Sequence, residues 1–275
     1  MKISAYIPCY NNAHTIQACV SGMQSLSPAP DELFVVDDGS TDQSVARVGN
    51  IGVRVVGMGA NQGRGAVRKR AMSEAQHELV LCCDATNVLP PDFLACAFPW
   101  FADAQVAAVY GRHVQSGAAN TAERWRGRHL YKMQEAAQVT HQALLVTACA
   151  IMRKSAVLAV GGFDVRFRHS EDAELGERLL AGGYDVVQDP ALRAISIGRN
   201  TVFKVLERYW RWNTARHGNL MLGAYLRNIS YSIKCLARQD IKAGDWQAAL
   251  VSLACPHYQM ALTLRERLTR RSGDS

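Results

Sequence analysis

Residues 34–42 read Phe-Val-Val-Asp-Asp-Gly-Ser-Thr-Asp, a short apolar run that ends in two adjacent acids, Asp37 and Asp38. A second apolar run, residues 79–84, reads Leu-Val-Leu-Cys-Cys-Asp and ends in Asp84. In an open parallel sheet such runs are strands buried on both faces, and ligands bind at their carboxyl ends. Burying an unpaired carboxylate is costly, so acids placed there are expected to meet a ligand. The expected ligand is a sugar, a nucleotide or both.

The region around these two runs alternates strand and helix patterns, which indicates a parallel sheet. Apolar runs predict strands at residues 3–8, 32–37, 53–57, 78–84 and 106–110, with a further candidate at 143–152. Helical spacing predicts helices near residues 13–25, 40–48, 65–75 and 92–102, and the polar stretch 112–142 is expected to be helical as well. The predicted fold class is therefore α/β, a mostly parallel mixed sheet flanked by helices.

Composition is compatible with a self-contained folded domain. The chain has 275 residues, of which 48% are hydrophobic, enough for a sizeable core. The first apolar run is too short for a signal peptide, and no stretch reaches the roughly 18 apolar residues of a membrane-spanning helix. The eight cysteines contain no Cys-x-x-Cys pair, so free thiols in a reducing cytoplasm are expected.

Positive charge is concentrated in the last part of the chain. Residues 199–275 contain 13 Lys and Arg against 5 Asp and Glu, whereas the whole chain carries +7. The basic residues are mixed with aromatic ones at 209–212, Tyr-Trp-Arg-Trp, which favours an anionic membrane surface or nucleic acid as a partner; a solvated helical face is the simpler alternative. Residues 229–271 have helical apolar spacing, which fits packing on the catalytic domain, a homo-oligomer contact or a membrane surface.

Several of the acidic stretches have a structural explanation. Ser170 is a candidate helix N-cap followed by Glu171 and Asp172, which complement the helix dipole by about 0.3 to 1 kcal/mol each. Ser40 is a similar candidate cap, and Asp84 is a candidate turn residue. A dinucleotide-binding domain would need a glycine-rich turn after the first strand, where residues 8–12 read Pro-Cys-Tyr-Asn-Asn instead.

Six stretches taken in order resemble the inverting GT-A glycosyltransferases of family 2. They are residues 7–11 (IPCYN), 35–42 (VVDDGSTD), 61–68 (NQGRGAVR), 84–86 (DAT), 161–164 (GGFD) and 171–175 (EDAEL). The resemblance covers roughly residues 1–215 and implies a nucleotide-diphosphate sugar donor, usually UDP- or GDP-linked. It also implies a saccharide or lipid-linked acceptor in polysaccharide or glycoconjugate synthesis.

The resemblance implies donor-binding roles for seven residues. Pro8 and Tyr10 would flank the nucleobase, and Asp37 or Asp38 would accept a hydrogen bond from the base or the ribose. Arg64 and Arg68 would approach the base or the diphosphate. Asp84 opens the DxD motif and is the expected metal ligand.

Catalytic and acceptor roles are implied in the same way. Asp172 resembles the general base that deprotonates the acceptor hydroxyl, with Glu171 beside it; such a base depends on geometry first and pKa second. Gly162 is an expected acceptor contact. Arg211 and Trp212 resemble the (Q/R)xxRW acceptor signature of processive synthases.

Two departures from the family pattern weaken the expected metal site. Thr86 stands where the second DxD carboxylate is usual, and residues 194–198, Ala-Ile-Ser-Ile-Gly, lack a histidine often found there. A neutral hydroxyl binds Mg²⁺ or Mn²⁺ much more weakly than a carboxylate. Either Asp84, Asn87, water and the diphosphate hold a metal loosely, or the basic residues Arg68, Arg193 and Arg199 neutralise the leaving group.

The sequence thus predicts a GT-A catalytic domain at residues 1–202 and a basic helical extension at 203–275. The expected activity is that of a cytoplasmic inverting glycosyltransferase, peripheral at the inner membrane face if the tail binds lipid. A catalytically silent nucleotide-sugar-binding or scaffold protein is the first alternative. A nucleic-acid-binding protein is the second; it would show steep salt dependence and no affinity for nucleotide sugars, and nucleic acid is not the expected partner.

Overall fold

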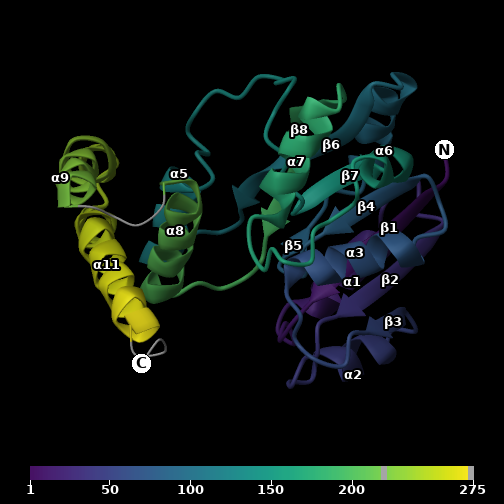
Figure 1. Cartoon of the computed structure of the whole chain (residues 1–275), viewed down its shortest axis with the longest axis horizontal. Helices are drawn as coiled ribbons and strands as arrows, with labels where there is room; N and C mark the ends of the chain where they lie inside the picture. The colour runs from purple at the N-terminus through teal and green to yellow at the C-terminus, as the bar shows by residue number, and fades with distance from the viewer. Residues whose placement is uncertain (218–221, 272–275) are drawn as a thin grey trace. The chain divides into compact units, whose positions relative to one another are not determined.

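A computed structural model describes the backbone of residues 1–217 and 222–271 and the side chains of residues 1–211 and 222–265 (Figure 1). The chain divides into two compact units. Unit 1 consists of residues 1–116 and 136–198, and unit 2 of residues 117–135 and 199–275.

Unit 1 is built on one eight-stranded sheet with the order β3-β2-β1-β4-β7-β6-β8-β5. Its strands are β1 (Ile3–Cys9), β2 (Glu32–Asp37), β3 (Arg54–Gly57), β4 (Leu79–Cys83), β5 (Asn87–Val88), β6 (Val106–Gln115), β7 (Cys149–Arg153) and β8 (Asp185–Ser196). β1 to β4 are parallel, β7 runs antiparallel to β4 and β6, and β8 is parallel to β6 and antiparallel to β5. The predicted mostly parallel, mixed α/β sheet is confirmed.

Helices and apolar residues fill both faces of this sheet. The helices of unit 1 are α1 (Ile16–Gln24), α2 (Ser44–Gly49), α3 (Arg64–Glu74), α4 (Phe93–Ala97), the 3₁₀ helix η1 (Phe98–Ala102), α6 (Lys154–Ala159) and α7 (Glu171–Ala181). Alternate residues along the central strands point to opposite faces. In β1, Ile3, Ala5 and Ile7 join one core with α1, while Tyr6 joins the other core with α3 and α7.

Unit 2 is helical and has a core of its own. It contains α5 (Thr121–His129), α8 (Val202–His217), α9 (Leu222–Tyr231), the π-helix η2 (Ser232–Ala237), α10 (Arg238–Lys242) and α11 (Trp246–Arg271). Fully buried Trp125 of α5 packs in a cluster with Val205, Leu236, Val251 and others, and its indole Nε1 donates to Ser252 Oγ over 2.8 Å. Within the described residues, no helix is both long and apolar enough to cross a bilayer.

The structure differs from the sequence prediction between residues 112 and 148. Residues 112–115 continue β6 instead of starting a helix, α5 is the only helix within 112–142, and the strand expected at 143–152 begins at Cys149. The predicted domain boundary at 202/203 lies close to the change of unit at 198/199, but residues 117–135 also belong to unit 2. They do so because Ala122 and Trp125 bury their apolar surface against that unit's other helices.

Candidate active site

The carboxyl ends of three parallel strands form one edge of the sheet, called here the carboxyl edge. β1 and β2 pair so that Cys9 lies beside Asp37, and β4 ends one residue before Asp84. The predicted acids therefore meet at one edge, as strand ends in a parallel sheet must.

Asp37 and Asp38 have different hydrogen-bond partners. Asp38 is buried and accepts three bonds from the loop before α3, from Asn61 Nδ2 at 3.0 Å, Gln62 N at 2.7 Å and Gly63 N at 3.0 Å. Asp37 is also buried; its Oδ2 accepts from Ser40 N at 3.0 Å, but its Oδ1 has no partner among the described residues. The polypeptide thus satisfies Asp38 and leaves one acceptor of Asp37 open.

The loop after β1 is fastened to the loop after β2. Asn11, in the left-handed region at φ 53°, accepts the backbone N–H of Thr41 on its Oδ1 and donates its own N–H to Ser40 Oγ, both at 2.9 Å. Ser40 does not cap the following helix as expected, because α2 begins only at Ser44. Tyr10 at the tip of the first loop is 46% exposed, and Pro8 below it is half-buried. These hydrogen bonds join the loop that carries Tyr10 to the turn that follows Asp37. The role of Asn11 was not predicted from the sequence, where the only signal was that asparagine tolerates a positive φ.

Arg68 of α3 connects the carboxyl edge to α7. It is 2% exposed, its Nε donates to Glu171 Oε1 at 2.8 Å, and its Nη2 donates to Asp84 Oδ1 at 3.2 Å. The remaining donor, Nη1, faces Tyr6 Oη and Cys82 Sγ. Arg68 therefore faces the protein interior, whereas Arg64 at the start of the same helix is exposed.

The electrostatic surroundings of Asp84 keep it ionised. Burial alone would raise the pKa of Asp84, but the positive charges of Arg68, Arg64 and His113 outweigh it and hold the pKa below the usual value. His113 of β6 was not expected here. The sequence offered no signal for it, because β6 reaches this edge only through the sheet order.

Glu171 and Asp172 begin α7, and their side chains differ in surroundings. Glu171 is 1% exposed. Its Oε1 accepts from Arg68, and its Oε2 has no partner among the described residues. Asp172 is half-buried; its Oδ2 accepts from the backbone N–H and the hydroxyl of Thr147, both at 3.3 Å. Thr147 interrupts the apolar run of residues 143–152, and that interruption was its signal. Ser170 precedes the helix but its side chain makes no capping bond.

Asp172 also lies close to Tyr110 of β6. Burial, with smaller electrostatic contributions from Cys149 and Asp172, raises the pKa of Tyr110 to about 12. Tyr110 therefore stays protonated at neutral pH.

The glycine-rich turn before α7 supports the start of α3. A Cβ on Gly65 would stand 2.4 Å from the carbonyl oxygen of Asp164, and Gly65 N donates to Phe167 O at 3.1 Å. Gly162, with φ 71°, accepts from Arg178 Nη2 on its carbonyl at 2.7 Å and has open space where a side chain would be. The motifs at 61–68 and 161–164 are thus in direct contact.

The residues around Asp84 do not form a metal cage by themselves. Asn87 is 2% exposed and its amide donates to Ala148 O, while Thr86 packs at the position where Gly198 would carry a side chain. Across the described residues no group of three or more His, Cys, Asp or Glu side chains is arranged to hold a metal ion. Asp84 is left as the one charged candidate ligand of the DxD position.

The stretch that resembles the acceptor signature lies in unit 2. Arg211 is half-buried in α8, with Nε 3.7 Å from Glu207 Oε1, and the side chain of Trp212 lies outside the described residues.

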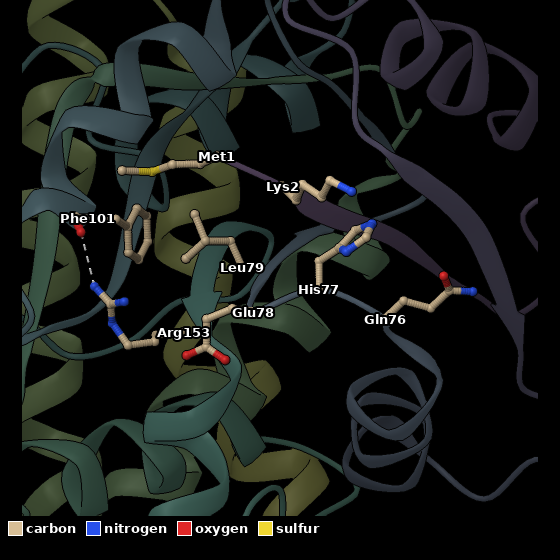
Figure 2. Close-up of a pocket in the computed structure, with 8 residues that line it drawn as sticks. All are labelled: Met1, Lys2, Gln76, His77, Glu78, Leu79, Phe101 and Arg153. Atoms are coloured by element: carbon tan, nitrogen blue, oxygen red, sulfur yellow. Dashed lines mark hydrogen bonds between the residues drawn. The ribbon is translucent and has the colours of Figure 1, made fainter.

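A cavity of about 390 Å³ occurs at the opposite edge of the sheet, where β1 and β4 begin (Figure 2). It is lined by Met1, Lys2, Gln76, His77, Glu78, Leu79, Phe101 and Arg153, none of which is a predicted site residue. The carboxyl edge, where the buried acids and Arg68 converge, remains the candidate active site.

Comparison with known proteins agrees with this architecture. A sequence profile described as Glycosyl transferase family 2 matches residues 4–161, more than half of the chain, so the protein belongs to glycosyltransferase family 2. The mannosyltransferase PcManGT from Pyrobaculum calidifontis, solved in complex with GDP-Man and Mn²⁺, superposes with a TM-score of 0.65 at 18% identity, over 96% of this chain and 86% of that chain. S. aureus TarS 1-349 superposes with a TM-score of 0.55 at 17% identity, over 99% and 92%. The GT-A fold expected from the sequence is confirmed.

Curated relatives are named for polysaccharide synthesis. The succinoglycan biosynthesis protein ExoA of Rhizobium meliloti is 25% identical over 239 residues, covering 78% of this chain and 69% of that protein. The poly-beta-1,6-N-acetyl-D-glucosamine synthase of Staphylococcus aureus (strain COL) is 22% identical over 229 residues, covering 80% of this chain and 55% of the synthase. The Staphylococcus epidermidis synthase is 29% identical over 94 residues, which is 33% of this chain and 23% of that protein. The chain thus aligns with about half or less of these synthases.

Proposed function

We propose that the protein transfers a sugar from a nucleotide-diphosphate donor to a saccharide or lipid-linked acceptor, with inversion at the anomeric carbon. The observation that carries the proposal is the buried guanidinium of Arg68, which joins Asp84 at the end of β4 to Glu171 at the start of α7. Through it, the donor-side acid Asp84 is linked to Glu171, the residue that directly precedes the candidate base Asp172 at the start of α7.

Recognition of the nucleotide is assigned to the first two loops. The open Oδ1 of Asp37 accepts an N–H group of the base, because an acceptor buried without a partner costs about 1 to 3 kcal/mol that a ligand donor recovers. Pro8 and exposed Tyr10 flank the base. Asp38 acts indirectly, since its oxygens hold the loop of residues 61–63.

The diphosphate is assigned to the start of α3. Exposed Arg64 and the helix N-terminus place positive charge near Asp84, and both favour a phosphate there. Mg²⁺ or Mn²⁺ would be held by Asp84 and the donor phosphates and would supply charge neutralisation of the leaving group. Arg64 provides positive charge there from the polypeptide itself.

The chemical step is assigned to Asp172. Its carboxylate takes the proton of the acceptor hydroxyl, the hydroxyl oxygen bonds to the anomeric carbon, and the bond to the nucleotide diphosphate breaks with its electron pair on the phosphate oxygen. Thr147 fixes the orientation of the carboxylate, and Glu171 positions the helix start through Arg68. Gly162, Arg211 and Trp212 are assigned to the acceptor. We place the enzyme in the cytoplasm, supported by eight cysteines that are all free thiols.

The test is a donor screen followed by one matched pair of variants. Release of nucleotide diphosphate and transfer to oligosaccharide and lipid-linked acceptors are measured for UDP- and GDP-sugars, with and without Mn²⁺. Asp172→Asn should lower turnover by a factor of about 10² or more with donor affinity little changed, because it removes basicity and keeps shape. Glu177→Gln, at an exposed position of the same helix, is the control and should turn over normally.

Two results would count against the proposal. Donor binding without any turnover in the wild-type protein would favour the silent binding protein, and normal turnover of Asp172→Asn would remove this residue from the base role.

A further inference from the structure

α11 exposes an apolar stripe on the side opposite the core of unit 2. Ala248, Val251 and Cys255 face that core. The opposite face presents Trp246, Leu250, Leu253 and Leu264, which are 67%, 58%, 40% and 50% exposed. Their spacing of 4, 7 and 18 residues from the first places them on one side of the helix, over about 27 Å at 1.5 Å per residue.

The segment before α11 continues this face. α9 buries none of its residues, and Leu222 and Leu226 are 70% and 59% exposed. Tyr225 between them lies against the exposed stripe of α11, with its hydroxyl 2.7 Å from Nδ1 of His257. Ile233 and Ile241 are exposed as well. The two helices therefore present apolar side chains side by side, a larger patch than scattered surface leucines would give.

All charged side chains exposed over residues 222–265 are basic. They are Arg227, Lys234, Arg238, Lys242 and Arg265. The two acids of the segment are buried against α5: Asp240 pairs with Arg128 and lies 2.8 Å from Nε2 of His129, and Asp245 pairs with Arg124. Over residues 222–265 the acidic side chains are thus buried, and the exposed charged side chains of this segment are all positive.

We propose that this face of α9, α10 and α11 docks unit 2 on an anionic phospholipid surface. Apolar side chains, an exposed tryptophan and basic residues on one helical face are the combination that buries into the boundary between headgroups and acyl chains. The positive charge of this face favours lipid over a second copy of the chain as its occupant. A two-fold contact would place the same basic patch against itself, whereas anionic headgroups neutralise it. The proposal is independent of catalysis, so it stands or fails separately from the transferase assignment.

The experiment measures binding of the full-length chain to vesicles by flotation. Vesicles of phosphatidylcholine alone are compared with vesicles that also contain phosphatidylglycerol, at low and high salt. Wild-type protein should float with the anionic vesicles, and salt should reduce binding because it screens the basic residues. Leu250→Gln with Leu253→Gln should lower the partition coefficient at least tenfold. Leu158→Gln, at a 55% exposed position of α6 in unit 1, is the matched control and should bind as wild type does.

Tryptophan fluorescence places the contact on the proposed face. Anionic vesicles should shift the emission to shorter wavelength, and Trp246→Phe should lose most of that shift. Equal binding to both vesicle types would overturn the proposal. So would a protein that binds no vesicles and is a dimer that Leu250→Gln dissociates, which would identify a second copy of the chain as the occupant of this face. A protein that binds no vesicles and is a monomer that Leu250→Gln destabilises would also overturn it and would identify unit 1 as the occupant.

Discussion

Asp37 and Asp38 carry the same side chain at neighbouring positions, yet the fold gives them different tasks. Alternation along a strand end turns them to different sides, so Asp38 meets the loop before α3 while Asp37 keeps one oxygen unpaired. The acid type and its place at the strand end could be predicted from the sequence. Their division of roles could not, because it depends on the loop of residues 61–63, which lies more than twenty positions away.

The division predicts opposite phenotypes for two substitutions. Asp37→Asn should leave the free energy of unfolding nearly unchanged and weaken nucleotide binding about tenfold or more, since it disturbs an acceptor that only a ligand would use. Asp38→Ala should lower the free energy of unfolding by about 2 kcal/mol or more, because it leaves two partly buried donors and the buried N–H of Gly63 without their acceptor. Urea unfolding and nucleotide-dependent thermal shifts separate the two effects. Unchanged nucleotide affinity in folded Asp37→Asn would contradict the assignment.

Thr86 determines the expected behaviour toward metal ions. With one charged ligand, Asp84, the protein without nucleotide should bind Mn²⁺ poorly, and calorimetry should detect no tight site. Thr86→Asp should strengthen binding by adding the second carboxylate, whereas the uncharged Thr86→Asn should not. Micromolar or tighter Mn²⁺ binding by the wild-type protein would mean that other residues complete the coordination.

At the scale of elements, the fold agrees with the sequence where burial is continuous. β2 was predicted at its observed limits, and β1, β3 and β4 within two residues, because each is built around a short apolar run. The prediction was wrong at residues 112–115, where Arg112 and His113 are half-buried and read as helix surface. Those residues pair with β8 after an irregular register, a contact between segments about 80 positions apart that local pattern does not contain.

The link between α3, β4 and α7 is the element-scale feature that sequence reasoning missed, because Arg68 and Glu171 are 103 positions apart. Arg68→Met should lower the free energy of unfolding by about 3 to 5 kcal/mol, since it leaves Glu171 buried without its counter-ion. Glu171→Met should have a similar cost, and the double variant should cost much less than the sum.

Urea unfolding of the four proteins in this double-mutant cycle measures the coupling. The more exposed pair Arg54 and Glu74, with Arg54 44% exposed, is the comparison and should couple by about 1 kcal/mol or less. Additive costs at Arg68 and Glu171 would show that the pair does not hold the elements together.

At the scale of the whole molecule, the two units have separate cores and should lose structure separately. Burial raises the pKa of Cys82 to about 12 and raises the pKa of Cys149 and Cys255, so these thiols are protected twice, by exclusion of reagent and by protonation. In native protein, thiol reagents should modify exposed Cys96 first.

In rising urea, Cys255 of unit 2 should become reactive before Cys82 and Cys149 of unit 1, because its core cluster is the smaller. Mass spectrometry of pulse-labelled protein gives the order. Simultaneous labelling of all three cysteines would indicate one cooperative molecule.

The chain passes between the two units three times, near residues 116, 135 and 198. These three crossings limit how the gene can be divided into parts that encode the separate units. A stop codon after residue 202 would keep Trp125 and remove the helices that cover it, and a start codon at 203 would supply those helices without the tryptophan. No single breakpoint in the coding sequence releases either unit intact, so recombination can exchange the helical unit between relatives only by replacing two separate stretches together.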